Sequence, residues 1–149
     1  MIIRKAILKD LGVLADFQQR LAFESENIRL NEENLRAGLT ALLTDATKGV
    51  YYLVEDDGSP VGCHLITYEW SDWRNGMVWW LQSVYVIDSH RKKGVFRKMY
   101  DNLINIIRND AGIIGLRLYV DKTNHRAMKV YDTMGMNGDH YTVYEWMKD

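Results

Sequence analysis

The chain has 149 residues, which is the size of one ordinary domain. Hydrophobic residues make up 47% of it and charged residues 26%, an average composition for a globular protein that excludes disorder as the main state. The 19 Lys and Arg residues against 20 Asp and Glu leave a net charge of -1. That balance argues against a protein that coats nucleic acid or an anionic membrane.

A single cysteine, Cys63, excludes an internal disulfide framework and a cysteine-based zinc site. The N-terminal residues lack the long apolar core of a signal peptide, and no stretch approaches the roughly 20 apolar residues that span a bilayer. With one proline and no low-complexity run, the chain has no obvious linker. We therefore expect a single cytoplasmic domain over residues 1–149, with no metal and no nucleic-acid or membrane partner.

The N-terminal third predicts one strand followed by two helices. Residues 2–7 alternate like a short strand, and Asp10 offers an oxygen that can cap the N-terminus of the next helix. Apolar residues then recur at helical spacing at Leu11, Leu14, Phe17 and Leu21. A second amphipathic helix begins near Asn31, whose side chain can also act as a cap.

The middle of the chain predicts an antiparallel meander of three strands. Residues 49–55, 60–70 and 77–86 are rich in β-branched and aromatic residues, and turn-forming residues separate them. Apolar residues occupy both faces of the third of these strands. We therefore expect that strand to lie inside the sheet and to be covered on both sides.

The C-terminal half predicts a long amphipathic helix beginning near Gly94, a strand at 113–120, a helix at 124–134 and a last strand at 141–147. The passage from residue 77 to residue 120 has the length of a crossover that joins parallel neighbours. The expected fold is therefore α/β: a single mixed, mostly antiparallel, twisted sheet of about six to seven strands with four helices on both faces.

A basic segment, residues 91–98, lies between the third meander strand and the N-terminus of the long helix. Five of its eight residues are Lys or Arg. A helix N-terminus offers unpaired backbone N–H groups and partial positive charge, and Gly94 lets the backbone approach a ligand closely. These features favour a pyrophosphate cradle, and a solvated basic turn is the alternative. The spacing matches neither the phosphate loop of nucleoside triphosphatases nor the three-glycine dinucleotide fingerprint.

Two motifs in their expected elements resemble the GCN5-related N-acetyltransferase (GNAT) superfamily. Residues 91–96 resemble the acetyl-CoA loop of that family, Gln/Arg-x-x-Gly-x-Gly/Ala, and residues 81–86 resemble the strand that precedes it. Residues 124–136 resemble the family segment Asn-x-x-Ala-x-x-x-Tyr-x-x-x-Gly-Phe. The chain departs from the pattern at Phe96, where the loop usually ends in Gly or Ala, and at Met136, where Phe is usual.

The resemblance implies direct transfer of an acetyl group from acetyl-CoA to a primary amine, carried by a small polyamine-like molecule or a peptide, without an acyl-enzyme. It also implies no metal, and it allows the homodimer that many relatives form. An acyl-CoA-binding sensor without turnover is the alternative within the same fold. Nucleic-acid binding through the basic segment is a weaker hypothesis than either of these, because the overall charge is near neutral.

By the same resemblance, acetyl-CoA is bound by the backbone of Val84, Tyr85 and Val86 and by Arg91, Lys92, Lys93, Gly94, Val95, Phe96, Arg97, Asn124 and Lys129. Structural alternatives stand beside these roles: Asn124 can cap its helix, and Lys129 can be a solvated lysine. Tyr131 is the candidate general acid toward the CoA sulfur, or else a core aromatic.

The candidate general base is Glu69, acting through water, although a structural role is open for it. His64 and Asp72 are weaker candidates, and Gln82 cannot accept a proton. We interpret Cys63 as a small buried side chain rather than a nucleophile. Glu24 and Glu26, near the end of the first helix, either attract a cationic acceptor or are solvated helix-end charges.

Overall fold

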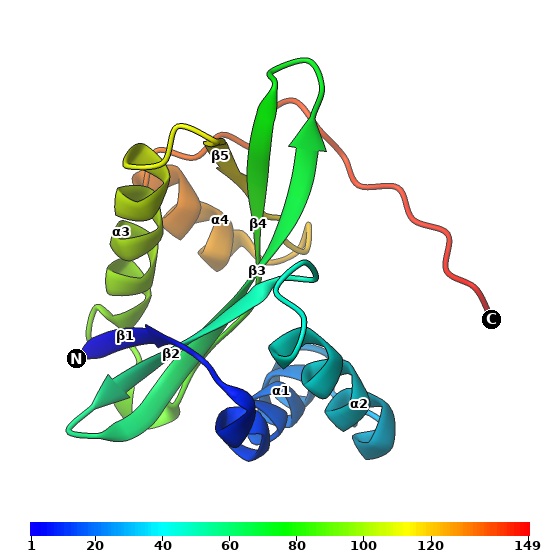
Figure 1. The fold of residues 1–149 in the computed structure, drawn as a ribbon, viewed down its shortest axis with the longest axis vertical. Helices are drawn as coiled ribbons and strands as arrows, with labels where there is room; N and C mark the ends of the chain where they lie inside the picture. Colours follow the sequence, from blue (N-terminus) through cyan, green and yellow to red (C-terminus); the bar gives the residue numbers. More distant parts are fainter. The chain divides into compact units, whose positions relative to one another are not determined.

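The computed structural model describes residues 1–149, which form two compact units, Met1–Arg117 and Leu118–Asp149. The first unit contains the strands and three of the four α-helices (Figure 1). In chain order its elements are β1 (Ile2–Lys5), η1 (Leu8–Asp10), α1 (Leu11–Glu26), α2 (Glu32–Leu43), β2 (Val50–Asp56), β3 (Ser59–Ser71), β4 (Gly76–Val86), η2 (Asp88–His90), α3 (Val95–Arg108) and β5 (Ile113–Arg117). The second unit contains α4 (His125–Thr133).

The five strands form one sheet in the order β1-β2-β3-β4-β5. Strands β1 to β4 pair antiparallel, and β5 pairs parallel with β4. This arrangement confirms the predicted meander, the crossover from β4 through α3 to β5, and the interior position of β4. It confirms a mixed, mostly antiparallel sheet, with fewer strands than the expected six to seven.

Two C-terminal expectations were wrong, and the second of them lowers the strand count. β5 ends at Arg117 rather than at residue 120, and residues 141–147 form no strand. Their apolar side chains are exposed, among them Tyr144 at 94% and Trp146 at 86%. Strand propensity alone does not make a strand, because a strand also needs a partner for its backbone groups.

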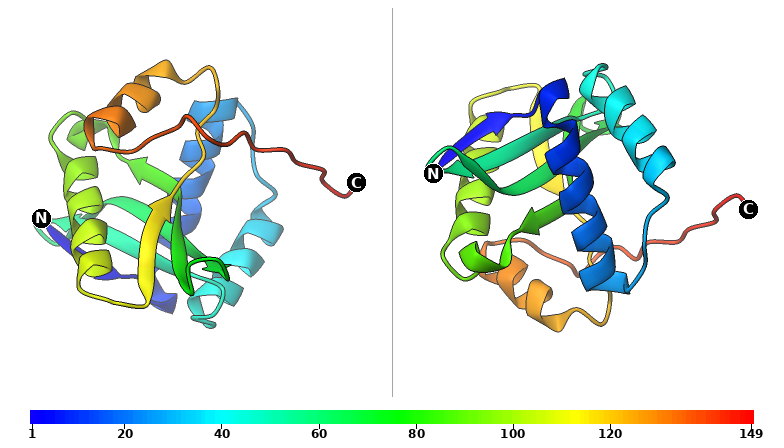
Figure 2. Two further views of the ribbon diagram at one scale, coloured as in Figure 1. Left: turned by 90° about the horizontal axis from the view of Figure 1, so that it is seen from above. Right: turned by 90° about the horizontal axis from the view of Figure 1, so that it is seen from below.

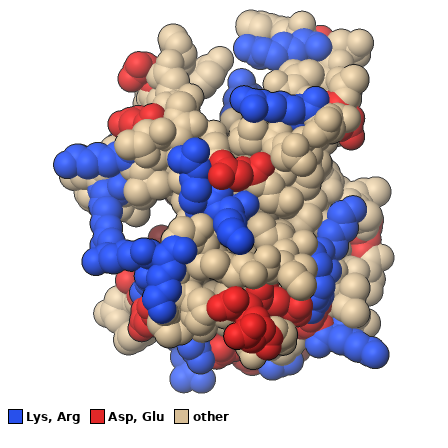
Figure 3. Space-filling model, turned by 90° about the vertical axis from the view of Figure 1, so that its left-hand side faces the viewer, with Lys and Arg blue, Asp and Glu red and all other residues tan.

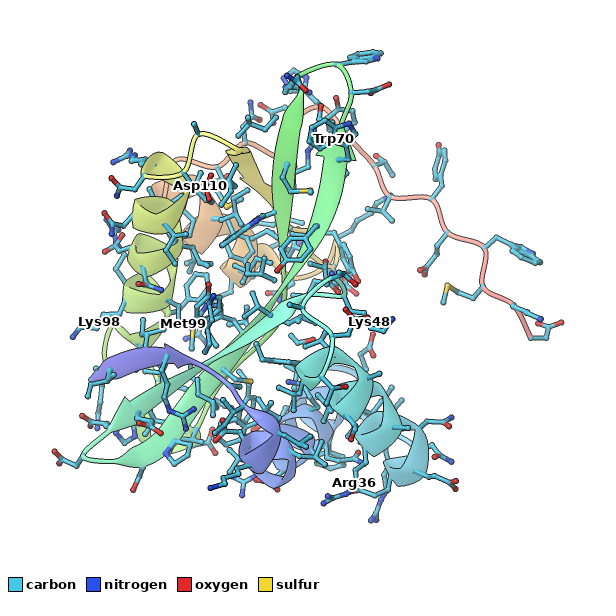
Figure 4. All side chains as sticks on the ribbon, viewed as in Figure 1. Arg36, Lys48, Trp70, Lys98, Met99 and Asp110 are labelled. Atoms are coloured by element: carbon cyan, nitrogen blue, oxygen red, sulfur yellow. The ribbon has the colours of Figure 1, made fainter.

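Helices cover both faces of the sheet, as the sequence predicts. On one face, α1 and α2 pack Leu14, Phe17 and Leu39 against Tyr51, Leu53, Cys63, Leu65 and Tyr85 of the strands. On the other face, α3 packs Val95 and Met99 against Val54 and Val61. Figures 1 and 2 show α1 and α3 on opposite sides of the strands, and in Figure 4 Met99 points from α3 toward the sheet while Lys98 points away.

One of the predicted caps for the first two helices is present and the other is not. Asn31 Oδ1 accepts a hydrogen bond from the Asn34 N–H at 2.9 Å, which confirms the cap of α2. Asp10 makes no such bond to α1. Its carboxylate instead accepts two bonds of 2.9 Å from the Arg4 guanidinium and one of 2.7 Å from the Ile7 N–H. Two parallel bonds from a guanidinium hold the carboxylate more strongly than one backbone N–H would, and they keep the pKa of Asp10 below its usual value.

His64 on β3 is fully buried, at 0% exposure, and neither of its ring nitrogens has a hydrogen-bond partner. Its ring stacks on Tyr52, with ring centroids 5.1 Å apart and planes 13° apart. Burial lowers the pKa of His64 to about 4, because a buried imidazolium would lose its hydration without a compensating partner. The neutral imidazole therefore behaves as part of the apolar core.

The burial of His64 predicts a pH dependence of folding. Below about pH 6.5 the unfolded chain protonates this residue while the folded chain does not, so stability falls as the pH drops toward 4. From pH 7.5 to pH 5 the loss from His64 amounts to about 2 kcal/mol. Urea unfolding at the two pH values should show a smaller loss for His64→Phe, whereas the control His140→Phe, in the exposed C-terminal segment, should match the parent. Equal losses in all three proteins contradict this assignment.

Candidate functional site

The edge of β4 that faces β5 is paired over only part of its length. β5 pairs with β4 from Met77 to Trp80, so residues 81–86 have no strand partner on that side. The Ile87 N–H bonds to the Val61 carbonyl on β3 at 3.0 Å. Because backbone groups alternate in direction along a strand, those of Val84 and Val86 point to the open edge. These are two of the three strand residues that the sequence predicts for the site.

A β-bulge lies within this open segment. Cys63 pairs with Tyr85 and Leu65 pairs with Gln82, so Ser83 and Val84 together oppose His64 alone. Ser83 has a left-handed backbone with φ of 53°. A bulge bends its strand and re-aims the following peptide groups. Here the bulge changes the direction of the Val84 backbone, in the segment of β4 that no longer pairs with β5.

The point where the two strands part is held by Glu69 on β3. Trp80 and Arg117 form the last pair of the β4–β5 ladder. The Trp80 Nε1–H donates to Glu69 Oε1 at 2.9 Å, and Arg117 Nη1 donates to Glu69 Oε2 at 2.6 Å. Both carboxylate oxygens of Glu69 are therefore engaged, and the side chain ties three adjacent strands together. Sequence reasoning missed Arg117, because a partner 48 residues away leaves no local signal.

The other end of the open edge is held by Arg91. Its Nε–H donates to the Val86 carbonyl oxygen at 2.8 Å, and its guanidinium forms ion pairs with Glu24 of α1, at 2.9 Å, and with Asp88. The guanidinium carbon lies 5.4 Å from the centre of the Tyr85 ring. The Arg91 side chain thus faces the protein, and it fixes the loop that follows β4.

The loop leads into an exposed helix N-terminus. Gly94 precedes α3 with a left-handed φ of 80°, and no side chain caps the helix. A Cβ atom at Gly94 would meet nothing within 4 Å, so the backbone is open to solvent or to a ligand there. The first N–H groups of a helix have no intrahelical acceptors, and the helix dipole makes this end partly positive. The geometry suits an anion such as a diphosphate.

Basic side chains surround this N-terminus. Lys92, Lys93 and Lys98 are exposed, and no acidic residue lies in the first turn of α3. Arg97 forms an ion pair with Asp101 on the same helix, with 3.1 Å between Arg97 Nε and Asp101 Oδ1. Figure 3 shows Lys and Arg side chains projecting from the face that carries α3. The positive charge available to a ligand therefore comes chiefly from the three lysines and from the backbone.

The side chains of Val95 and Phe96 turn inward. Val95 is buried at 2% exposure, and Phe96 packs against the apolar cluster that contains Val95 and Met99. The unusual aromatic residue at the end of the motif thus belongs to the core beneath α3. The Phe96 N–H stays in the first turn of the helix, where a ligand could use it.

The second unit contains the other predicted residues. Asn124 Oδ1 accepts a bond from the Ala127 N–H at 3.1 Å, so Asn124 caps α4. The helix ends in a Schellman motif, in which Gly135 has a left-handed φ of 86° and the Met136 N–H bonds to the Tyr131 carbonyl at 3.1 Å. Lys129 is exposed and Tyr131 is half-buried, and burial raises the pKa of Tyr131.

The remaining reactive residues do not form a nucleophilic or metal centre. Cys63 is buried at 0% exposure, and burial raises its pKa to about 12, which keeps it a thiol. Asp72 is exposed and accepts a bond from the Trp73 N–H at 2.9 Å. No three His, Cys, Asp or Glu side chains are grouped so that they could hold a metal ion. None of the helices has the length and apolar character that crossing a bilayer requires.

Comparisons with known proteins agree with this architecture. The model of the GNAT acetyltransferase family matches residues 11–136. The crystal structure of a possible acetyltransferase from Clostridium difficile 630 is 40% identical, with a TM-score of 0.94 over 99% of this chain and 97% of that chain. The crystal structure of a predicted acetyltransferase with acetyl-CoA from Clostridium acetobutylicum is 20% identical and shares the fold, with a TM-score of 0.76 over 97% and 95% of the two chains.

A search among curated proteins gives no significant match. The family model spans most of the chain, and the 40% identical structure covers nearly all of it. The chain therefore belongs to the GNAT acetyltransferase family.

Proposed function

We propose that the protein transfers an acetyl group from acetyl-CoA to a primary amine, on a small polyamine-like molecule or a peptide. The observation that carries this proposal is the open edge of β4, residues 81–86, leading directly into the uncapped N-terminus of α3. An extended amide chain can pair with the first feature, and a diphosphate can bind at the second. The structural neighbour that holds acetyl-CoA supports this choice of donor.

The residues of the first unit suit such a donor in two ways. The backbone groups of Val84 and the N–H of Val86, whose carbonyl already accepts from Arg91, are positioned to bond the amides of a pantetheine arm as an added strand would. An N–H at the bulge can face the thioester oxygen. The N–H groups at the start of α3, the open backbone at Gly94 and the exposed lysines suit the diphosphate.

In the transfer, the amine nitrogen bonds to the carbonyl carbon of the thioester and the carbon–sulfur bond breaks. The amine loses a proton and the departing sulfur gains one. An N–H donor at the bulge stabilises the negative charge that develops on the carbonyl oxygen. Tyr131 donates the proton to sulfur in this proposal. A phenol carries its proton at neutral pH, and burial raises the pKa of Tyr131 further.

Glu69 remains the candidate acceptor of the amine proton, and its contacts with β4 and β5 also give it a structural role. Its carboxylate already accepts bonds from Trp80 and Arg117. Both of its oxygens therefore already hold a hydrogen bond within the protein. We therefore assign Glu69 first to holding the strands at the point where they part, and the base role is secondary.

This engagement of Glu69 also supports a second candidate function, an acyl-CoA-binding module without turnover. Gln82, within the open edge, donates to the Thr67 hydroxyl and cannot act as a base. Calorimetric titration with acetyl-CoA, followed by measurement of thiol release with a panel of amines, separates the two functions. Binding with amine-dependent thiol release supports the transferase, and binding without it on every amine supports the module. Absence of binding contradicts both.

A negative charge at the loop should block the donor. Gly94→Glu places a carboxylate where the diphosphate would lie, so we expect acetyl-CoA affinity to fall at least a hundredfold. Gly94→Ala introduces the backbone strain at φ of 80° without the charge and should cost about 1 kcal/mol of stability. Calorimetry on both variants, with thermal unfolding as the check on folding, tests the cradle. Wild-type affinity in Gly94→Glu would remove the diphosphate from this position.

The proposed acid should affect turnover more than binding. Tyr131→Phe removes the proton donor and should lower kcat roughly 10- to 100-fold, at the low end of acid–base effects because a thiolate is a fair leaving group. The dissociation constant for acetyl-CoA should stay within about twofold. Tyr119→Phe, at a residue 63% exposed in the same unit, serves as the control. An equal loss of binding and turnover would return Tyr131 to a packing role.

A further inference from the structure

We infer that Glu24, at the end of α1, is a positioning residue that holds the acetyl-CoA loop in its binding geometry through Arg91. The inference rests on the proposed function, because it treats residues 91–96 as the donor loop. It gives Glu24 a different role from attraction of a cationic acceptor.

Each Arg91 nitrogen has its own acceptor within the protein. Nε donates to the Val86 carbonyl at 2.8 Å, Nη2 to Glu24 Oε2 at 2.9 Å, and Nη1 pairs with Asp88 Oδ1. The guanidinium also lies 5.4 Å from the centre of the Tyr85 ring. A planar fork used in this way has one orientation, so the backbone of Arg91 is fixed relative to the end of β4.

Of the three acceptors, Glu24 alone belongs to a distant part of the chain: it lies on α1, whereas Val86 and Asp88 lie next to the loop. Val86 and Asp88 are within five residues of Arg91, whereas Glu24 is 67 residues away on the helix that covers the sheet. The Glu24–Arg91 pair therefore anchors the loop to the body of the fold. Glu24 also lies in the last turn of α1, where the helix dipole disfavours a negative charge, so the cation beside it relieves that repulsion.

This arrangement decides which charges remain for the diphosphate. Two carboxylates, Glu24 and Asp88, neutralise Arg91, so its contribution is to place the loop and not to attract the anion. Lys92, with a left-handed φ of 60°, and Gly94 follow immediately in backbone conformations that aim the next N–H groups. If the loop were not held, its ordering would oppose binding of the donor.

A second contact limits the size of the effect. His90 Nε2 lies 3.1 Å from Asp56 Oδ2 at the end of β2, which gives the loop another anchor. The side chains of Glu24 and Arg91 are 37% and 41% exposed, so their pair is partly screened by solvent. Loss of Glu24 should therefore loosen the loop without unfolding it, and its effect should shrink as the salt concentration rises.

The test compares Glu24→Gln with Glu26→Gln, a matched charge removal on the exposed last turn of the same helix. Hydrogen exchange of the ligand-free proteins should be faster across residues 87–94 in Glu24→Gln and unchanged in Glu26→Gln. The dissociation constant and KM for acetyl-CoA should rise about fivefold in Glu24→Gln, with kcat at saturating donor and KM for the amine within twofold. The fivefold ratio should fall toward one at 0.5 M salt.

The two readouts separate the possible failures. If the wild-type protein binds no acetyl-CoA, the proposed function fails, and faster exchange in Glu24→Gln alone would still establish the anchor. If the wild type binds acetyl-CoA and both variants match it in exchange and affinity, the inference is overturned and the proposed function stands. A rise in KM for the amine with unchanged donor affinity also overturns it, because Glu24 would then act on the acceptor.

Discussion

The parting of β4 from β5 after Trp80 is the constraint on which the candidate site depends. A strand interior to a sheet normally has both edges paired, and unpaired backbone groups are costly unless water or a ligand satisfies them. Here the segment 81–86 pairs with β3 on one edge and has no strand partner on its other edge. The proposed function uses this open edge to bind another extended amide chain, with the pairing to β3 as its support.

Two arginines define the limits of this edge. Arg117 reaches Glu69 at the last β4–β5 pair, and Arg91 bonds the Val86 carbonyl where β4 ends. Neither guanidinium is left for a ligand to neutralise, since each is paired with a carboxylate of the protein. Their effect is geometric: one fixes where the strands separate and the other fixes where the loop begins. In the proposed function, recognition of the anion falls to the lysines and to the start of α3.

The sequence predicted the elements well where a local pattern determines them. Turn residues marked the three meander strands, and Asn31 and Asn124 marked two helix starts through caps that form as expected. It failed where a distant partner decides the outcome. The Asp10 carboxylate binds Arg4 instead of capping α1, and residues 141–147 have strong strand propensity but form no strand.

For the site, the motif at 91–96 predicted the helix N-terminus and the open glycine, both of which are present. It could not predict the roles of Glu24 and Arg117, because each acts across dozens of residues through the tertiary fold. Nor could it predict that Phe96 packs inward, since one aromatic residue in a loop motif carries no direction. The roles of Tyr131, Asn124 and Lys129 in the reaction stay predictions from the family motif.

The central claim, that the open edge of β4 and the start of α3 bind the donor, is tested most directly by amide hydrogen exchange resolved to single residues. Spectra would be compared with and without saturating acetyl-CoA. The claim predicts that protection rises at Val84 and Val86 and at residues 94–97, while the amides of β1 and β2 on the far side of the sheet are unchanged. Protection confined to other residues, with no change along β4 and the start of α3, would contradict it.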